Sequence, residues 1–292
     1  MASWTDGYWW SNDGVRLHYR DYPGNEPARP PIICIPGLTR NARDWEGVAA
    51  RLAGDWRLIC VDLRGRGESG YAKDPMTYVP LTYLQDLEAL LRELALDRFV
   101  LFGTSLGGLL SMLLGAAETP RVGGVLINDI GPAIDEEGIA RIRTYVGRTQ
   151  TWPTWVHAAR DLAEVHGDCF PEWELEQWLV FAKRLGRLNA SGRISLDYDM
   201  RIAEPFKIAQ PVAGMDMWSA FSALRDIPTL VVRGETSDIL SAATVERMAA
   251  EHPGLETLTL PGIGHAPTLD EPAAQAAINR LLARVEERLQ LA

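Results

Sequence analysis

A single serine stands among glycines in the stretch LFGTSLGGLL, residues 101–110. Gly103, Ser105 and Gly107 fit the pattern G-x-S-x-G, which here follows the apolar run RFVLF and precedes the helix-like run LGGLLSMLLGAA. A turn this sharp strains the serine backbone and brings chain segments close together, which glycines permit because they have no side chain. We therefore predict that Ser105 is a nucleophile at the start of a helix, where backbone N–H groups and the helix dipole can stabilise an oxyanion.

A serine hydroxyl needs a base within hydrogen-bond reach before it can act as a nucleophile. His265 lies in the glycine-rich loop LPGIGHAPTLDEP, between the strand-like run LETLTL and the terminal helix, and this places it at the carboxyl end of a strand. The other histidines fall in the early hairpin, in the middle of the chain and at a helix end, and they are His18, His157, His166 and His252. We predict that His265 is the base.

Two aspartates could orient the imidazole and stabilise its cationic form. Asp238, in VVRGETSDIL, follows a buried strand by a short loop, and the chain order Ser105, Asp238, His265 agrees with the order expected for this arrangement. Asp129, in VLINDIGP, ends an earlier strand and remains the alternative acid, although we expect it to anchor a hinge. We predict Asp238 as the third member.

The oxyanion of acyl transfer needs two N–H donors. One is expected from Leu106, which follows the nucleophile, and the other from the loop IPGLTRNARDW after the third strand. In that loop Gly37 permits a close approach of the backbone, and Leu38 would present its N–H.

The elements that must position these residues alternate along the chain. Asn12-Asp13-Gly14 with alternating Val15, Leu17 and Tyr19 predicts an antiparallel hairpin. Short apolar runs then predict strands buried on both faces, at 32–35, 58–61, 99–102, 125–127 and 229–232. Helices are expected at 81–94, 106–117, 241–251 and 271–290. This pattern predicts an α/β sheet whose site lies in loops at the carboxyl ends of the strands.

The alternation stops after Gly131 and resumes with IPTLVVRG. We predict that residues 131–215 form a helical lid inserted after the sixth strand, and that residues 1–130 and 216–292 form the core. Tryptophans mark the lid, and we expect them to build its own hydrophobic core: Trp152, Trp155, Trp173 and Trp178.

The composition of the chain argues against some classes of binding partner. The chain has 292 residues, 47% of them hydrophobic, and a formal net charge of −10, which argues against a nucleic-acid partner or an anionic membrane surface. We expect neither a signal peptide nor a membrane span, since no window approaches the roughly 18 apolar residues of a span. Cys34, Cys60 and Cys169 are predicted to be reduced thiols, which favours a cytoplasmic location. The expected partner is a small-molecule substrate, and the oligomeric state stays open.

With these residues in place, the chain resembles the α/β-hydrolase superfamily, in its lidded esterase, lactonase and carbon–carbon hydrolase branch. The resemblance is carried by GTSLGG, PGLTRNARDW, VDLRGRGESG, RGETSDIL and GIGHAPTL. It implies a mostly parallel eight-stranded sheet flanked by helices, with an inserted helical lid. It also implies that Ser105 is the nucleophile, His265 the base and Asp238 its partner, with Leu38 and Leu106 as oxyanion donors. No cofactor and no metal are expected.

Two departures from that pattern affect the site. Pro36-Gly37 replaces the His-Gly of many relatives, so the oxyanion loop must be supported by other residues. Asp238 lies four residues beyond Gly234, one more than in the commonest loop of the family. The charges of DLRGRGES are predicted to form scaffold salt bridges. Haloalkane dehalogenases and epoxide hydrolases are excluded, because they place an aspartate where this chain has Ser105.

The expected reaction is hydrolysis of a small apolar or aromatic carboxylic ester or lactone through an acyl-enzyme. Two alternatives remain: hydrolysis of a carbon–carbon bond in a vinylogous diketone, and a ligand receptor that keeps the fold without turnover. One cation of the lid could pair with a substrate carboxylate; the candidates are Arg141, Arg143, Arg148, Lys183, Arg184 and Arg187.

Overall fold

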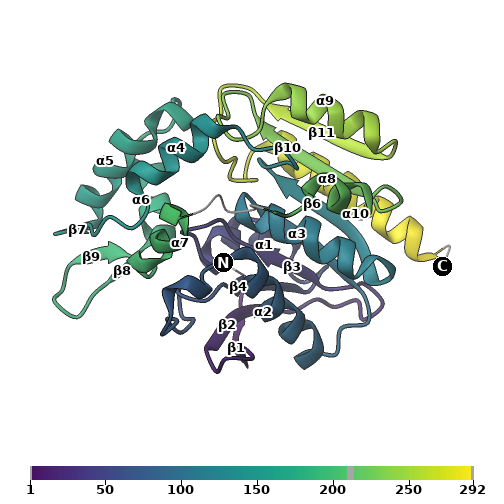
Figure 1. Cartoon of the computed structure of the whole chain (residues 1–292), viewed down its shortest axis with the longest axis horizontal. Helices are drawn as coiled ribbons and strands as arrows, with labels where there is room; N and C mark the ends of the chain where they lie inside the picture. The colour runs from purple at the N-terminus through teal and green to yellow at the C-terminus, as the bar shows by residue number, and fades with distance from the viewer. Residues whose placement is uncertain (1, 209–213, 291–292) are drawn as a thin grey trace.

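The computed structural model describes residues 2–208 and 214–290. Its largest element is an eight-stranded sheet, whose strands are β1 (Thr5–Trp10), β2 (Arg16–Tyr22), β3 (Ile32–Ile35), β4 (Leu58–Asp62), β5 (Phe99–Thr104), β6 (Val122–Asn128), β10 (Thr229–Gly234) and β11 (Leu255–Leu260). The strand order is β1-β2-β4-β3-β5-β6-β10-β11 (Figure 1). Pairing is antiparallel for β1 with β2 and for β2 with β4, and parallel for the other neighbours. The predicted mostly parallel sheet and its early hairpin are confirmed.

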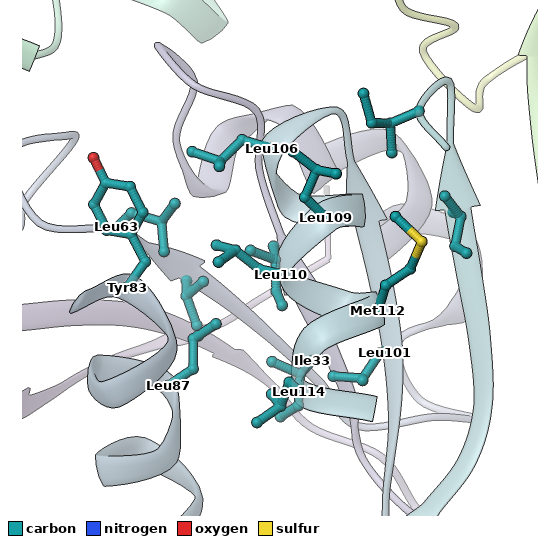
Figure 2. Packing of buried hydrophobic residues seen from close by; sticks show 14 of the residues in the cluster. Ile33, Leu63, Tyr83, Leu87, Leu101, Leu106, Leu109, Leu110, Met112 and Leu114 are labelled. Atoms are coloured by element: carbon teal, nitrogen blue, oxygen red, sulfur yellow. The ribbon is translucent and has the colours of Figure 1, made fainter. Parts of the chain in front are cut away.

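Helices cover both faces of this sheet because its strands are apolar on both sides. They are α1 (Glu46–Leu52), α2 (Pro80–Glu93), α3 (Leu106–Ala117), α8 (Met217–Ser222), α9 (Ala242–Glu251) and α10 (Pro272–Gln290). Ile33 and Ile35 face a core shared with α2, α3, α8 and α9, and Figure 2 shows leucines of α3 in this layer. Ile32 and Cys34, on alternate positions, face a second core shared with α1 and α10.

Between β6 and α8 the chain leaves the sheet and builds a separate layer, which we call the insertion (Figure 1, teal to green). Its helices are α4 (Glu136–Tyr145), α5 (Trp155–His166), α6 (Leu175–Leu185) and α7 (Ala203–Ile208). The insertion also holds a three-stranded sheet of β7 (Thr151–Trp152), β9 (Ile194–Leu196) and β8 (Gly186–Leu188). This small sheet was not predicted, because strands of two or three residues are too short to show a period. Residues 209–213 of the predicted lid lie outside the described residues.

The predicted tryptophans of the lid pack against one another and their neighbours. Trp152 and Trp178 are buried in a cluster with Phe170 and Phe181, and Trp155 and Trp173 pack against it. Phe170 stacks on the Trp173 ring with a centroid distance of 3.9 Å. The insertion therefore has a hydrophobic core of its own, as expected for these aromatic residues.

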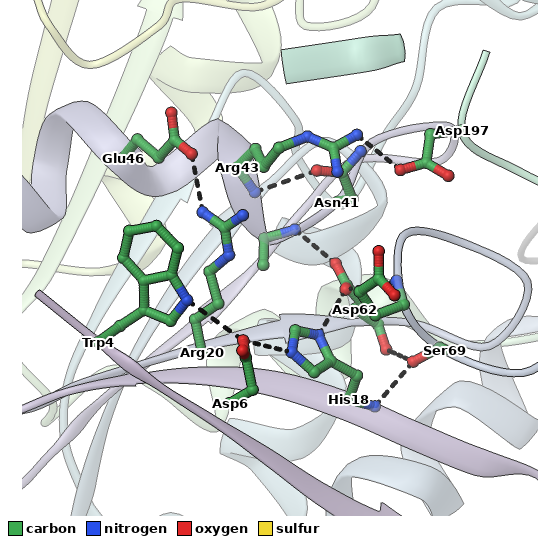
Figure 3. Close-up of polar contacts among 12 residues, drawn as sticks. Trp4, Asp6, His18, Arg20, Asn41, Arg43, Glu46, Asp62, Ser69 and Asp197 are labelled. Carbon is green, nitrogen blue, oxygen red and sulfur yellow. Dashed lines mark hydrogen bonds and ion pairs between the residues drawn. The ribbon is translucent and has the colours of Figure 1, made fainter. Parts of the chain in front are cut away.

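A buried polar network fixes the loop after β3 (Figure 3). Asp62 Oδ1 accepts from the Ala42 N–H at 2.6 Å, and Asp62 Oδ2 lies 2.7 Å from Nδ1 of His18. The other ring nitrogen of His18 lies 3.0 Å from Asp6. Burial by itself lowers the pKa of His18, but the two carboxylates outweigh it and the pKa is raised. His18 thus links β1, β2 and β4 through contacts of both its ring nitrogens with carboxylates.

The charges of DLRGRGES belong largely to this scaffold. Arg64 is buried and donates to both Asp86 and Asp13, with N–O distances of 2.6 to 2.9 Å. Ser69 donates to the backbone carbonyl of Asp62 at 2.6 Å. These contacts agree with the predicted salt bridges.

Candidate active site

Ser105 occupies the tight turn between β5 and α3. Its φ is +53°, in the left-handed region that side chains rarely adopt. A Cβ at Gly103 would lie 2.2 Å from the Gly107 carbonyl oxygen, and a Cβ at Gly107 would lie 2.0 Å from the Ile35 carbonyl oxygen. The pattern G-x-S-x-G is therefore required by close backbone contacts on both sides of the serine, and the sharp turn that it predicts is present.

His265 meets the serine hydroxyl. Its Nε2 lies 2.9 Å from Ser105 Oγ. The loop after β11 that carries His265 is held by Asn128, whose side-chain amide donates to the Pro267 carbonyl at 2.8 Å. The structure thus brings together the two side chains that the sequence analysis paired, from segments 160 residues apart.

The carboxylate beside His265 belongs to Asp129. Its Oδ2 lies 2.7 Å from His265 Nδ1 and accepts from Ser237 Oγ at 2.6 Å, while its Oδ1 accepts from the Gly234 N–H at 2.7 Å. Asp129 is fully buried. Because a carboxylate only accepts, Nδ1 of His265 carries the proton, and Nε2 is free to accept from the Ser105 hydroxyl.

The prediction that Asp238 is the partner of His265 is wrong. Asp238 instead forms an ion pair with Arg141 of α4, which donates to both carboxylate oxygens, with one N–O distance of 2.7 Å. Burial opposes ionisation of Asp238, but the hydrogen bonds and charge of Arg141 outweigh it, and the pKa of Asp238 lies below its usual value. The carboxylate at the His265 imidazole is that of Asp129, the alternative acid, for which we expect a hinge role from the sequence.

The physical reason lies in the order of the strands. β5 and β6 are neighbours, with Thr104 opposite Asn128, so the residues that follow them, Ser105 and Asp129, emerge side by side. Ser105 N–H also donates to the Asn128 carbonyl at 2.9 Å. The loop after β10 contributes Ser237 and the Gly234 amide to the same carboxylate, and its next residue, Asp238, reaches the insertion.

The loop after β3 approaches the serine as predicted. A Cβ at Gly37 would lie 3.7 Å from Ser105 Cβ, and Leu38 and Leu106 both line a cavity that reaches Ser105. The structure thus places Leu38 and Leu106, the two candidate oxyanion donors, beside Ser105.

The support that a histidine would give this loop comes from Arg66, a residue of the DLRGRGES segment whose sequence context predicts only a scaffold salt bridge. Arg66 is completely buried, and its Nε donates to the Leu38 carbonyl at 2.8 Å. Its Nη1 donates to the Arg64 carbonyl at 2.6 Å and lies 2.9 Å from the Tyr83 hydroxyl. Holding the Leu38 carbonyl fixes the peptide plane between Leu38 and Thr39, directly after the Leu38 N–H. The absence of histidine from Pro36-Gly37 was the one signal in the sequence for such a residue.

A cavity of about 140 Å³ extends from Ser105 and His265 between the core and the insertion. Its polar wall includes Arg40, which pairs with Asp44 at 2.7 Å, and Arg184, which pairs with Asp270 at 3.0 Å. The cavity shares Phe181, Arg184 and Thr268 with an outer groove of about 440 Å³. Of the candidate lid cations, Arg184 therefore lines the cavity and Arg141 binds Asp238.

The cavity also contains a neutral histidine. Burial and the positive charge of Arg40 lower the pKa of His166 to about 4. Its ring packs edge-on against Tyr145 and Phe181. Burial raises the pKa of the Tyr145 hydroxyl. His166 is therefore an uncharged wall of the cavity at neutral pH.

Over residues 2–208 and 214–290, no helix is long and apolar enough to cross a membrane. In the same described ranges no group of three or more His, Cys, Asp or Glu side chains could hold a metal ion. The three cysteines are free thiols, and those of Cys34 and Cys60 are buried.

Residues 32–278 match a family model described as "Alpha/beta hydrolase family". Among curated proteins, the chain is 34% identical over 266 residues to a "3-hydroxybutyrate-oligomer hydrolase" of Cupriavidus necator, covering 88% of this chain and 89% of the relative. It is 28% identical to a "2-(acetamidomethylene)succinate hydrolase" of Mesorhizobium japonicum, covering 81% of each. Among solved structures, an alpha/beta hydrolase of Novosphingobium aromaticivorans is 58% identical with a TM-score of 0.93, covering 97% of this chain and 99% of that chain.

Proposed function

We propose that this chain, which belongs to the alpha/beta hydrolase family, hydrolyses a small apolar or aromatic carboxylic ester or lactone through an acyl-enzyme on Ser105. The observation that carries the proposal is the continuous chain of contacts from Ser105 Oγ to His265 Nε2 at 2.9 Å and from His265 Nδ1 to Asp129 Oδ2 at 2.7 Å. An oriented base of this kind activates a hydroxyl that is otherwise a weak nucleophile.

In the proposed mechanism Ser105 Oγ attacks the carbonyl carbon while His265 Nε2 takes the hydroxyl proton. Asp129 stabilises the imidazolium that forms. The amides of Leu38 and Leu106 bind the oxyanion, and His265 then gives its proton to the leaving alcohol, which departs. Water attacks the acyl-enzyme by the reverse sequence, with His265 again as base, and releases the acid and Ser105.

The cavity and one relative support an ester as substrate. A volume of about 140 Å³ is close to that of cavities that hold a single aromatic ring, which suits a small substrate. The relative from Cupriavidus necator is named for oligomers of a hydroxy acid, and such oligomers are joined by ester bonds. The free cysteines favour a reducing compartment, and we infer a cytoplasmic location.

The test compares the wild-type chain with Ser105→Ala, using fluorophosphonate labelling and turnover of p-nitrophenyl acetate and butyrate. Ser191→Ala, at an exposed serine in the turn before β9, is the matched control. We expect labelling and turnover in the wild type and the control, and neither in Ser105→Ala.

Labelling without steady turnover would indicate a receptor and contradict the proposal. Turnover of a dienoate diketone with no turnover of any ester or lactone would indicate carbon–carbon hydrolysis instead. Absence of both labelling and turnover would contradict acyl transfer altogether.

A further inference from the structure

Ser105 lies between two cavities of different character. The larger is the one described above, and the smaller, of about 40 Å³, lies beside the first turns of α3. Ser105, Leu38 and Ile142 line both. His265 and the residues that follow it line the larger cavity, whereas Leu106 and Leu109 line the smaller, and Figure 2 shows both leucines on the first turns of α3.

Proton transfer assigns one part of the substrate to each cavity, and this step rests on the proposed function. His265 must give its proton to the leaving oxygen, so the leaving group has to lie on the side of the imidazole, in the larger cavity. The carbonyl oxygen points toward the amides of Leu38 and Leu106. The acyl chain is the remaining substituent of the carbonyl carbon, and the smaller cavity is the space on its side.

The smaller cavity suits a short hydrocarbon. Ser105 apart, the described residues that line it are all apolar: Leu38, Leu106, Leu109, Ile130, Ile134, Ile139, Ile142, Phe206 and Ile239. On the scale on which a cavity of about 150 Å³ holds a six-carbon ring, 40 Å³ holds roughly two heavy atoms. A hydroxyl placed there would lose its hydration without gaining a hydrogen bond from these side chains.

We infer that this smaller cavity is the acyl-chain subsite, and that it selects unsubstituted acyl groups with about two carbon atoms beyond the carbonyl. Of the two cavities, Ile139 on α4 and Ile134 just before it line only the smaller one, so substitutions at these positions change its size and leave the lining of the larger cavity unchanged. The inserted segment thereby determines acyl-chain specificity, while the core supplies the reacting groups.

The test measures kcat/KM for p-nitrophenyl esters from acetate to octanoate. We expect the wild type to prefer propionate to butyrate and to the longer esters, and to turn over the 3-hydroxybutyrate ester at least about fivefold more slowly than the butyrate ester. Ile139→Ala is expected to raise the hexanoate-to-butyrate ratio about tenfold, since each buried methylene contributes about fourfold. Ile139→Phe is expected to raise the acetate-to-butyrate ratio by a similar factor.

Val165→Ala is the control, because Val165 lines the larger cavity and is half exposed. Its chain-length ratios should stay within about threefold of the wild type, which is less than one buried methylene contributes, because Val165 does not line the smaller cavity. If Ile139→Ala lowers the melting temperature enough to prevent the assay, Ile134→Ala tests the same wall.

The outcomes separate this inference from the proposed function. Ester turnover with chain-length ratios unchanged in both Ile139 variants would overturn the acyl subsite and leave ester hydrolysis standing. A larger shift in Val165→Ala than in Ile139→Ala would reverse the assignment of the two cavities. Failure of the wild type to turn over any ester would contradict the proposed function and this assignment together.

Discussion

The substitution that tests the site most directly is Asp129→Asn, compared with Asp238→Asn. Asp129 accepts from His265, Ser237 and the Gly234 amide, and it is fully buried. An asparagine keeps one acceptor oxygen and gains an NH₂ group. Since Oδ1 must still accept from Gly234, the NH₂ group faces His265 Nδ1.

That change reverses the tautomer of the imidazole. Nδ1 must become the acceptor, so Nε2 carries the proton and can no longer take one from Ser105. Loss of the correct tautomer in a serine triad lowers kcat by about 10⁴, which is roughly 5 kcal/mol of barrier. The backbone should keep its conformation, because Asp129 has a φ of +55° and asparagine tolerates that region.

Asp238→Asn removes only one partner of the ion pair with Arg141, and the Asp238 side chain is 22% exposed. Partly exposed pairs contribute about 1 kcal/mol or less. We expect kcat/KM for p-nitrophenyl butyrate within about threefold of the wild type, consistent with that small energy. Thermal unfolding of both variants checks that they are folded.

The opposite ranking would refute the reasoning. If Asp238→Asn lowered kcat about 10³-fold or more while Asp129→Asn kept a kcat near that of the wild type, the carboxylate that orients His265 would have to come from the loop after β10. Equal losses in both variants, with normal melting temperatures, would show that the two carboxylates act together.

Two further predictions follow from the residues that hold the site. Arg66→Lys should lower kcat about 10- to 100-fold with KM within about threefold, because a single ammonium group cannot contact the Leu38 carbonyl, the Arg64 carbonyl and the Tyr83 hydroxyl together. The loop that carries the Leu38 N–H would then be held less firmly, at a cost below the roughly 3 kcal/mol of losing an oxyanion donor outright. An unchanged kcat in a folded variant would contradict this. The pKa of His18 is raised in the folded state, so its contribution to stability is complete below about pH 6.5 and is lost as the pH rises through the folded-state pKa. The free energy of unfolding, measured with urea at a series of pH values, should begin to fall at a lower pH in Asp6→Asn than in the wild type. Identical pH profiles for Asp6→Asn and the wild type would contradict a stabilising charge on His18.

Much of the fold could be predicted because its signals are local. The runs that form β3, β4 and β5 are continuous and apolar, and α3 begins and ends where its sequence indicates. Ser105 can be identified from the sequence because only glycine fits two positions before and two positions after it. His265 can be identified from the sequence because it lies in the loop after the last strand of the sheet.

The acid could not be chosen from the sequence in the same way. Asp129 and Asp238 both follow buried strands, and the choice depends on which strand lies beside β5 and on which way each side chain turns. Arg141 settles the orientation of Asp238, and it comes from a helix of the insertion that no pattern relates to that loop. The role of Arg66 depends likewise on tertiary contacts, since its sequence context indicates only a salt-bridge scaffold.

The outer groove beside α6 has a consequence for the size of the alcohol that can depart. Phe181, Arg184 and Thr268 line both this groove and the cavity that we assign to the leaving alcohol, so on this assignment these three side chains determine whether a long alcohol can extend from the serine toward the surface. On this assignment an ester of a short acid with a bulky alcohol would fit, whereas an ester of a long acid with a small alcohol would not.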